Sequence, residues 1–69
     1  NMPNVTDNLN ELKTFIDTLY KDAEKHDRGQ KAAGTRLRKG LQELRTACQT
    51  LRVSILAERK DEDSSEENA

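Results

Sequence analysis

Two seven-residue repeats run together through residues 29–60, and no proline interrupts them. The first repeat is apolar: side chains recur at alternating spacings of four and three residues, the a/d pattern of a helix packed along a contact line, or seam. In this half of the chain its members are Leu37, Leu41, Leu44, Cys48, Leu51 and Ile55. The pattern therefore predicts one long helix whose apolar side faces another helix.

The second repeat is cationic and lies beside the first. Its members occur at every seventh residue and are Lys31, Arg38, Arg45, Arg52 and Arg59. With Leu41 at an a position, these cations fall at e, whereas the g positions on the opposite flank hold the small residues Gly40, Ala47 and Ser54. The sequence thus predicts a helix with one positive edge and one edge that lets a neighbouring backbone come close.

The first half of the chain carries the same apolar spacing, at Val5, Leu9, Leu12, Ile16, Leu19 and Ala23. Asn4 or Thr6 can cap the start of this helix. Residues 25–30 contain no apolar side chain, and Gly29 suits a left-handed helix C-cap. We therefore expect an antiparallel hairpin with helices over residues 6–27 and 30–60, a disordered lead-in at 1–5 and a disordered acidic tail at 61–69. The longer second helix should project beyond the first or contact another chain.

A chain of 69 residues with 32% hydrophobic content cannot enclose a thick core. Self-association would bury a second face, so the predicted fold is all-α, a helical hairpin that assembles as a coiled-coil-like homo-oligomeric bundle. Cys48 is interpreted as a small buried hydrophobe, the alternative being a crosslink between two chains. The predicted oligomer seam comprises Leu9, Leu12, Ile16, Leu19, Leu37, Leu41, Leu44, Cys48, Leu51 and Ile55.

The formal net charge of −1 argues against a simple nucleic-acid binder, but it conceals an uneven distribution. Cations gather between residues 28 and 60, while the last nine residues carry five anions and no cation. The acidic tail could shield the basic edge or act as a solvated solubility segment. Gly34 and Gly40 indicate close helix packing, or else bare backbone that lets a phosphate approach the helix N-terminus.

No arrangement of residues typical of catalysis is present. The chain has one His and one Cys, 22 residues apart, and no pair of either at metal-ligand spacing. His26 is most simply an exposed polar residue of the turn. We therefore expect no enzymatic activity, cofactor, metal site or small-molecule substrate. No apolar run is long enough to cross a membrane, which favours a cytoplasmic location.

The basic residues around the start of the second helix are the remaining candidates for a binding site. Lys and Arg on successive helical turns can neutralise DNA phosphates without reading sequence. The alternative is that they form the salt-bridged margin of a bundle, pairing with Asp17, Asp22 and Glu24 of the first helix. The predicted phosphate-binding residues are Arg28, Lys31, Arg36, Arg38, Lys39 and Arg45.

The segment from Gly29 to Arg38, GQKAAGTRLR, resembles the core of the bacterial linker-histone-like proteins, a chlamydial-type family of histone-like DNA-binding proteins. The resemblance covers about residues 9–60. It implies nucleoid-associated, sequence-independent binding and compaction of double-stranded DNA, with Lys31, Arg36, Arg38 and Lys39 matching the basic positions. Longer members continue into a Lys- and Ala-rich tail, whereas this short form ends in acidic residues.

The expected function is therefore that of a small histone-like DNA-binding protein of the nucleoid. Two alternatives stay open on the residues alone. The first is a helical oligomerisation or interaction module with no nucleic-acid partner, and the second is a regulator that binds an acidic protein.

Overall fold

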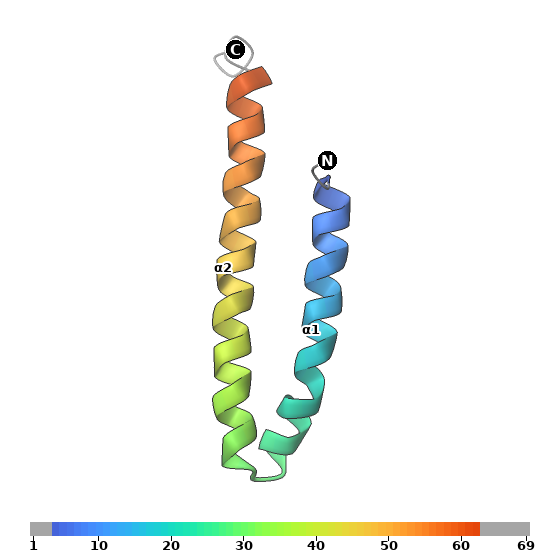
Figure 1. Ribbon diagram of the computed structural model, residues 1–69, viewed down its shortest axis with the longest axis vertical. Coiled ribbons are helices and arrows are strands. Elements are labelled where there is room, and N and C mark those ends of the chain that lie inside the picture. Colours follow the sequence, from blue (N-terminus) through green and yellow to red (C-terminus); the bar gives the residue numbers. More distant parts are fainter. Residues whose placement is uncertain (1–3, 63–69) are drawn as a thin grey trace.

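In the computed structural model the chain is two antiparallel α-helices joined by a short turn (Figure 1). Helix α1 spans Val5–Asp27 and helix α2 spans Lys31–Glu62. The structure describes residues 4–62, and side chains as far as residue 58, so the predicted tail from residue 63 onward and most of the predicted lead-in lie outside the described residues. The all-α helical hairpin predicted from the two repeats is confirmed. Helix α2 continues through residues 61 and 62, which the sequence analysis assigned to the tail.

The start of α1 is capped by Asn4. Its side-chain Oδ1 accepts a hydrogen bond of 2.8 Å from the backbone N–H of Asp7. This bond satisfies one of the backbone donors that a helix N-terminus leaves unpaired, which typically contributes about 1 kcal/mol.

The turn between the helices is closed by its own backbone. Gly29 adopts a φ of 96°, in the left-handed region that favours glycine. Its N–H donates to the carbonyl of His26 at 2.9 Å, and the N–H of Gln30 donates to the carbonyl of Lys25 at 3.0 Å. This pair of bonds is the Schellman motif, so local geometry ends α1 and lets α2 begin at the residue after Gln30.

The two helices meet along a line of buried and half-buried residues, which recur at alternating spacings of three and four. On α1 these residues are Val5, Asn8, Leu12, Phe15, Leu19 and Asp22. On α2 they are Ala33, Leu37, Gly40, Leu44, Ala47, Leu51 and Ser54, of which Ala33 and Gly40 are fully buried. The contact between the helices therefore includes the small residues at the g positions of α2, Gly40, Ala47 and Ser54.

Two glycines of α2, Gly34 and Gly40, lie against side chains of α1. A Cβ on Gly40 would lie 2.5 Å from Cδ2 of Leu19, and one on Gly34 would lie 2.7 Å from Nδ1 of His26. Each glycine therefore makes room for a side chain of α1. Helix packing therefore explains both glycines, but the neighbours are side chains of α1 and not its backbone, as the sequence analysis had predicted for the small edge.

The contact line within the hairpin differs from the predicted seam. Of the ten predicted residues, five lie half-buried between the helices: Leu12, Leu19, Leu37, Leu44 and Leu51. The other five are exposed: Leu9, Ile16, Leu41, Cys48 and Ile55. The prediction that Cys48 is buried is therefore wrong for the hairpin. The small g residues of α2 face α1 in place of the larger a residues, so the line of a residues is left exposed.

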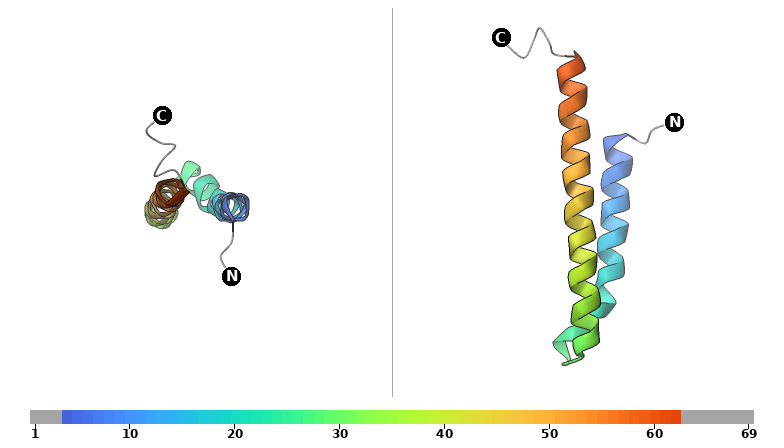
Figure 2. Two further views of the ribbon diagram at one scale, coloured as in Figure 1. Left: turned by 90° about the horizontal axis from the view of Figure 1, so that it is seen from above. Right: turned by 60° about the vertical axis from the view of Figure 1, so that its left-hand side comes forward.

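Helix α2 has 32 residues and α1 has 23, so α2 extends past the start of α1 (Figures 1 and 2). The part of α2 around and beyond the start of α1 carries Val53, Ile55 and Leu56, which are 52%, 37% and 53% exposed. The core is thin, because Ala33 is the only fully buried apolar side chain among the described residues. Neither described helix has a stretch apolar enough to span a lipid bilayer.

Candidate nucleic-acid interface

The two helices carry opposite charge. Helix α1 contains six acidic residues against three lysines. Helix α2 contains, up to Glu58, six cationic residues against two acidic ones. The hairpin is thus negative on one side and positive on the other, so a polyanion would be attracted to the α2 side and repelled from the α1 side.

A row of exposed cations follows the outer edge of α2, at Lys31, Arg38, Arg45 and Arg52. Successive members are seven residues apart, a rise of about 10.5 Å, and the row spans about 32 Å. This length is close to one turn of B-DNA, about 34 Å. Lys39 is also exposed and lies about 100° around the helix from Arg38, on the outward side of α2. No acidic residue occupies the first turn of α2, so the positive end of the helix dipole adds to the same field.

Arg36 differs from the other predicted phosphate-binding residues because it is engaged inside the hairpin. Its Nε and Nη2 donate hydrogen bonds of 3.1 Å and 2.9 Å to Oδ1 of Asp22 on α1. This is the one ion pair among the residues whose side chains the structure describes. Asp22 is one of the three acids that the sequence analysis proposed as partners of the cations. It is paired, but its partner Arg36 lies outside the row.

The ion pair changes the titration of both side chains. The hydrogen bonds from Arg36 hold the pKa of the Asp22 carboxyl below its ordinary value of 3.8, and they raise the pKa of Arg36. The pKa of Asp22 is lower in the folded chain than in the unfolded chain. The ion pair therefore stabilises the hairpin at pH values above the ordinary pKa of an aspartate. That contribution is lost as the pH falls through the lowered pKa.

The other predicted residues are placed as follows. Arg28 is exposed in the turn, at the same end of the hairpin as Lys31. Arg52 belongs to the row but was not among the predicted site residues, although the seven-residue repeat itself pointed to it. Its Nη1 donates a 2.7 Å hydrogen bond to Oε1 of Gln49, a neighbour on the same helix. The side chain of Arg59 lies outside the described part of the chain.

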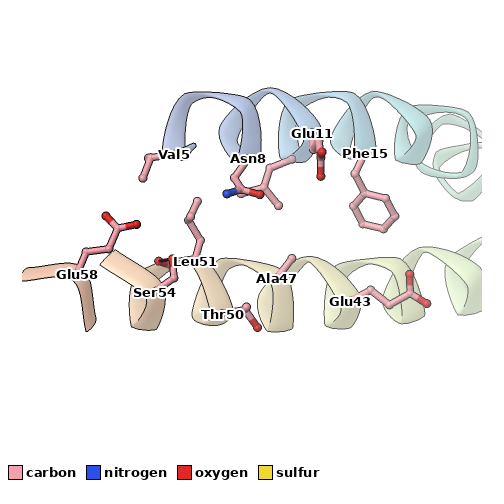
Figure 3. Close-up of a pocket in the computed structure, with 11 residues that line it drawn as sticks. Val5, Asn8, Glu11, Phe15, Glu43, Ala47, Thr50, Leu51, Ser54 and Glu58 are labelled. Carbon is pink, nitrogen blue, oxygen red and sulfur yellow. Dashed lines mark hydrogen bonds between the residues drawn. The ribbon is translucent and has the colours of Figure 1, made fainter. Parts of the chain in front are cut away.

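An open groove lies between the helices, towards the end of the hairpin away from the turn (Figure 3). It has a volume of about 590 Å³, with Phe15, Ala47 and Leu51 among its walls. The charged residues that line it are all acidic: Glu11, Glu43 and Glu58. This face of the hairpin would therefore repel phosphate.

Groups that could perform other chemistry are few. Within the described residues, no cluster of three His, Cys, Asp or Glu side chains could hold a metal ion. His26 and Cys48 are both exposed, on different helices.

Comparison with models of protein families gives a match. The model of a family described as Histone H1-like protein Hc1 matches residues 6–61. The match includes all but the first residue of α1 and the last residue of α2, the turn and the whole described part of the cationic row. No curated protein and no solved structure matches the chain significantly.

Proposed function

Because the chain belongs to the family of histone H1-like Hc1 proteins, we propose that it binds double-stranded DNA through the outer edge of α2, independently of base sequence. Proteins of this family package DNA and are not enzymes. The location that follows from this function is the nucleoid. The observation that carries the proposal is the row of exposed cations on α2, none of which is in an ion pair within the described side chains.

The proposed contacts are electrostatic. Arg28, Lys31, Arg38, Lys39 and Arg45 are exposed on the turn end and the outer edge of α2, where they would neutralise phosphates. The groove between the helices is lined by acidic side chains, so the proposed contacts lie on the outer edge of α2 and not in that groove. Affinity would therefore come from counterion release.

Fluorescence anisotropy with a labelled DNA duplex tests the proposal. Five phosphate contacts predict a slope of about −4.5 in log affinity against log salt, so binding should weaken about 500-fold between 50 and 200 mM salt. Two duplexes of unrelated sequence should bind equally. Absence of binding at the lower salt concentration, or a slope near zero, would show that the cations do not bind DNA phosphates.

Asp22→Asn should strengthen DNA binding. The substitution releases Arg36, which lies one helical turn before Lys39, and leaves it free to contact phosphate beside that lysine. The salt slope should then steepen by about 0.9, and affinity at 50 mM salt should rise about tenfold. The matched control is Asp17→Asn, which removes the same charge from an exposed residue of α1. An equal gain from both substitutions would mean that only net charge matters, and that Arg36 is not held back by Asp22.

A second candidate function is a helical interaction module without a nucleic-acid partner. The observation that favours it is the set of large apolar side chains left exposed on both helices, including Leu9 at 54% and Leu41 at 47%. Under this function the cations of α2 would pair with acids of another chain. A chain that associates normally but gives no anisotropy change with DNA would support this candidate over the first.

A further inference from the structure

A line of neutral polar side chains runs along α2 beside the cationic row. Its members, which we call the neutral line, are Thr35, Gln42 and Gln49, and they are seven residues apart, as the cations are. All three side chains are exposed, and they lie on the side of α2 opposite its contact line with α1. The phosphate contacts proposed above leave these three side chains without a role.

Cations lie on both sides of the neutral line. Around the axis of α2, Arg38 and Arg45 lie about 40° and 60° to one side of Gln42, and Lys39 lies about 60° to the other side. The nearest acid in this part of the helix, Glu43, is about 100° from Gln42 and lines the groove between the helices. The outward side of α2 therefore presents neutral hydrogen-bonding groups in the middle and positive charge on both flanks.

One member of the neutral line is held by the cationic row. Oε1 of Gln49 accepts the 2.7 Å hydrogen bond from Nη1 of Arg52. This bond engages the oxygen end of the amide. The nitrogen end carries two N–H donors, so it is the end that a hydrogen-bond acceptor outside the chain would meet.

We propose that α2 lies in the major groove of the DNA duplex, with the neutral line facing the base edges and the cations reaching phosphates on both walls. This inference rests on the proposed DNA binding and names the groove that is used. The major groove is about 12 Å wide and admits one α-helix, whereas the minor groove is only about 6 Å wide. Seen end-on in Figure 2, the acidic helix α1 lies on one side of α2 and leaves the other side open to the duplex.

Contacts of this kind suit any base sequence. Every base pair contains a purine, and the N7 of either purine is a hydrogen-bond acceptor in the major groove. The amide N–H groups of Gln42 and Gln49 and the hydroxyl of Thr35 can donate to that nitrogen. The neutral line would therefore add hydrogen bonds while the binding stays independent of base sequence.

The position of the neutral line along α2 agrees with this placement. The major groove winds around the duplex while α2 is straight, so the middle of the row would lie deepest in the groove. Gln42 lies near the midpoint between Lys31 and Arg52, the two ends of the row. These end cations, about 32 Å apart, would meet phosphates where α2 passes over the DNA backbones.

A duplex with a blocked major groove tests the proposal. Anisotropy titrations compare two duplexes of one sequence, in one of which every cytosine is replaced by glucosylated 5-hydroxymethylcytosine. The sugar is uncharged and occupies the major groove, and it leaves the phosphates and the minor groove unaltered. Affinity for the modified duplex should be at least about tenfold lower, because α2 loses its place in the groove.

Equal affinity for the two duplexes would overturn the major-groove placement and leave the proposed DNA binding intact. Binding to neither duplex at 50 mM salt would overturn the proposed DNA binding, and this inference with it. The two failures are therefore distinguished by the unmodified duplex alone.

The double variant Gln42→Ala and Gln49→Ala tests the neutral line itself. Loss of two hydrogen bonds should weaken binding about tenfold. The salt slope should stay at about −4.5, because no cation is removed. Alanine has the highest helix propensity, so circular dichroism should still report helix.

The matched control for the neutral line is Asn10→Ala with Thr14→Ala, which removes two exposed neutral side chains from α1 and should leave affinity unchanged. Wild-type affinity in the glutamine variant would overturn the role of the neutral line. So would a shallower salt slope in that variant, or an equal loss of affinity in the control.

Dimethyl sulfate provides a second measurement on the unaltered protein and DNA. This reagent methylates guanine N7 in the major groove and adenine N3 in the minor groove. Saturating protein should slow methylation of guanine N7 several-fold and leave adenine N3 unchanged. Unchanged methylation of guanine N7, or protection of adenine N3 in its place, would overturn the proposal.

Discussion

Leu44→Asp is expected to unfold the hairpin. Leu44 is half-buried between α1 and α2, in the middle of the contact line. Aspartate removes apolar contacts and places a carboxylate where solvent access is restricted, which we estimate at about 3 kcal/mol or more. A domain of this size has only about 3–5 kcal/mol of stability to lose. Circular dichroism should therefore show the helical signal largely lost at room temperature.

The control for this prediction is Thr46→Asp. It introduces the same carboxylate on the exposed side of α2, two residues further along. Aspartate and threonine have similar helix propensities, so the melting temperature should change little. Retention of a wild-type melting curve by Leu44→Asp would show that the contact line does not hold the hairpin together.

Removing two cations of the α2 row is expected to weaken DNA binding about a hundredfold at 50 mM salt, since two of five phosphate contacts are lost. The variant is Arg38→Gln with Arg45→Gln, and both side chains are exposed. The salt slope should fall from about −4.5 to about −2.7. Anisotropy titrations at several salt concentrations measure both quantities.

The matched control removes two cations from the other helix, with Lys13→Gln and Lys21→Gln. The net charge changes by the same amount, but these exposed lysines belong to the acidic helix. Affinity should stay within about threefold of the wild type, as expected for charges that make no phosphate contact. Equal losses in the two variants would indicate attraction by overall charge alone, without a defined interface on α2.

Much of the fold could be predicted from local sequence. The alternating spacings of three and four residues predicted both helices, Gly29 predicted the turn, and Asn4 was one of two proposed N-caps. These features are local because a helix repeats every 3.6 residues and a glycine at positive φ ends it without a partner from elsewhere in the chain. The family resemblance carried by residues 29–38 was likewise readable from the sequence and is confirmed by the family match.

Tertiary structure decided which apolar residues meet and which basic residues are engaged. On α2 the a and d positions form one line of residues, and the d and g positions form another. Both lines repeat every seven residues, so the spacing alone could not show which of them faces α1. Gly40 has no side chain and leaves room for the side chain of Leu19, and this contact places the d/g line between the helices. With this packing, Leu41 and Cys48 are exposed and Arg36 lies 2.9 Å from Asp22. The sequence determined that there are two amphipathic helices, whereas only their packing determined the faces that remain open to a partner.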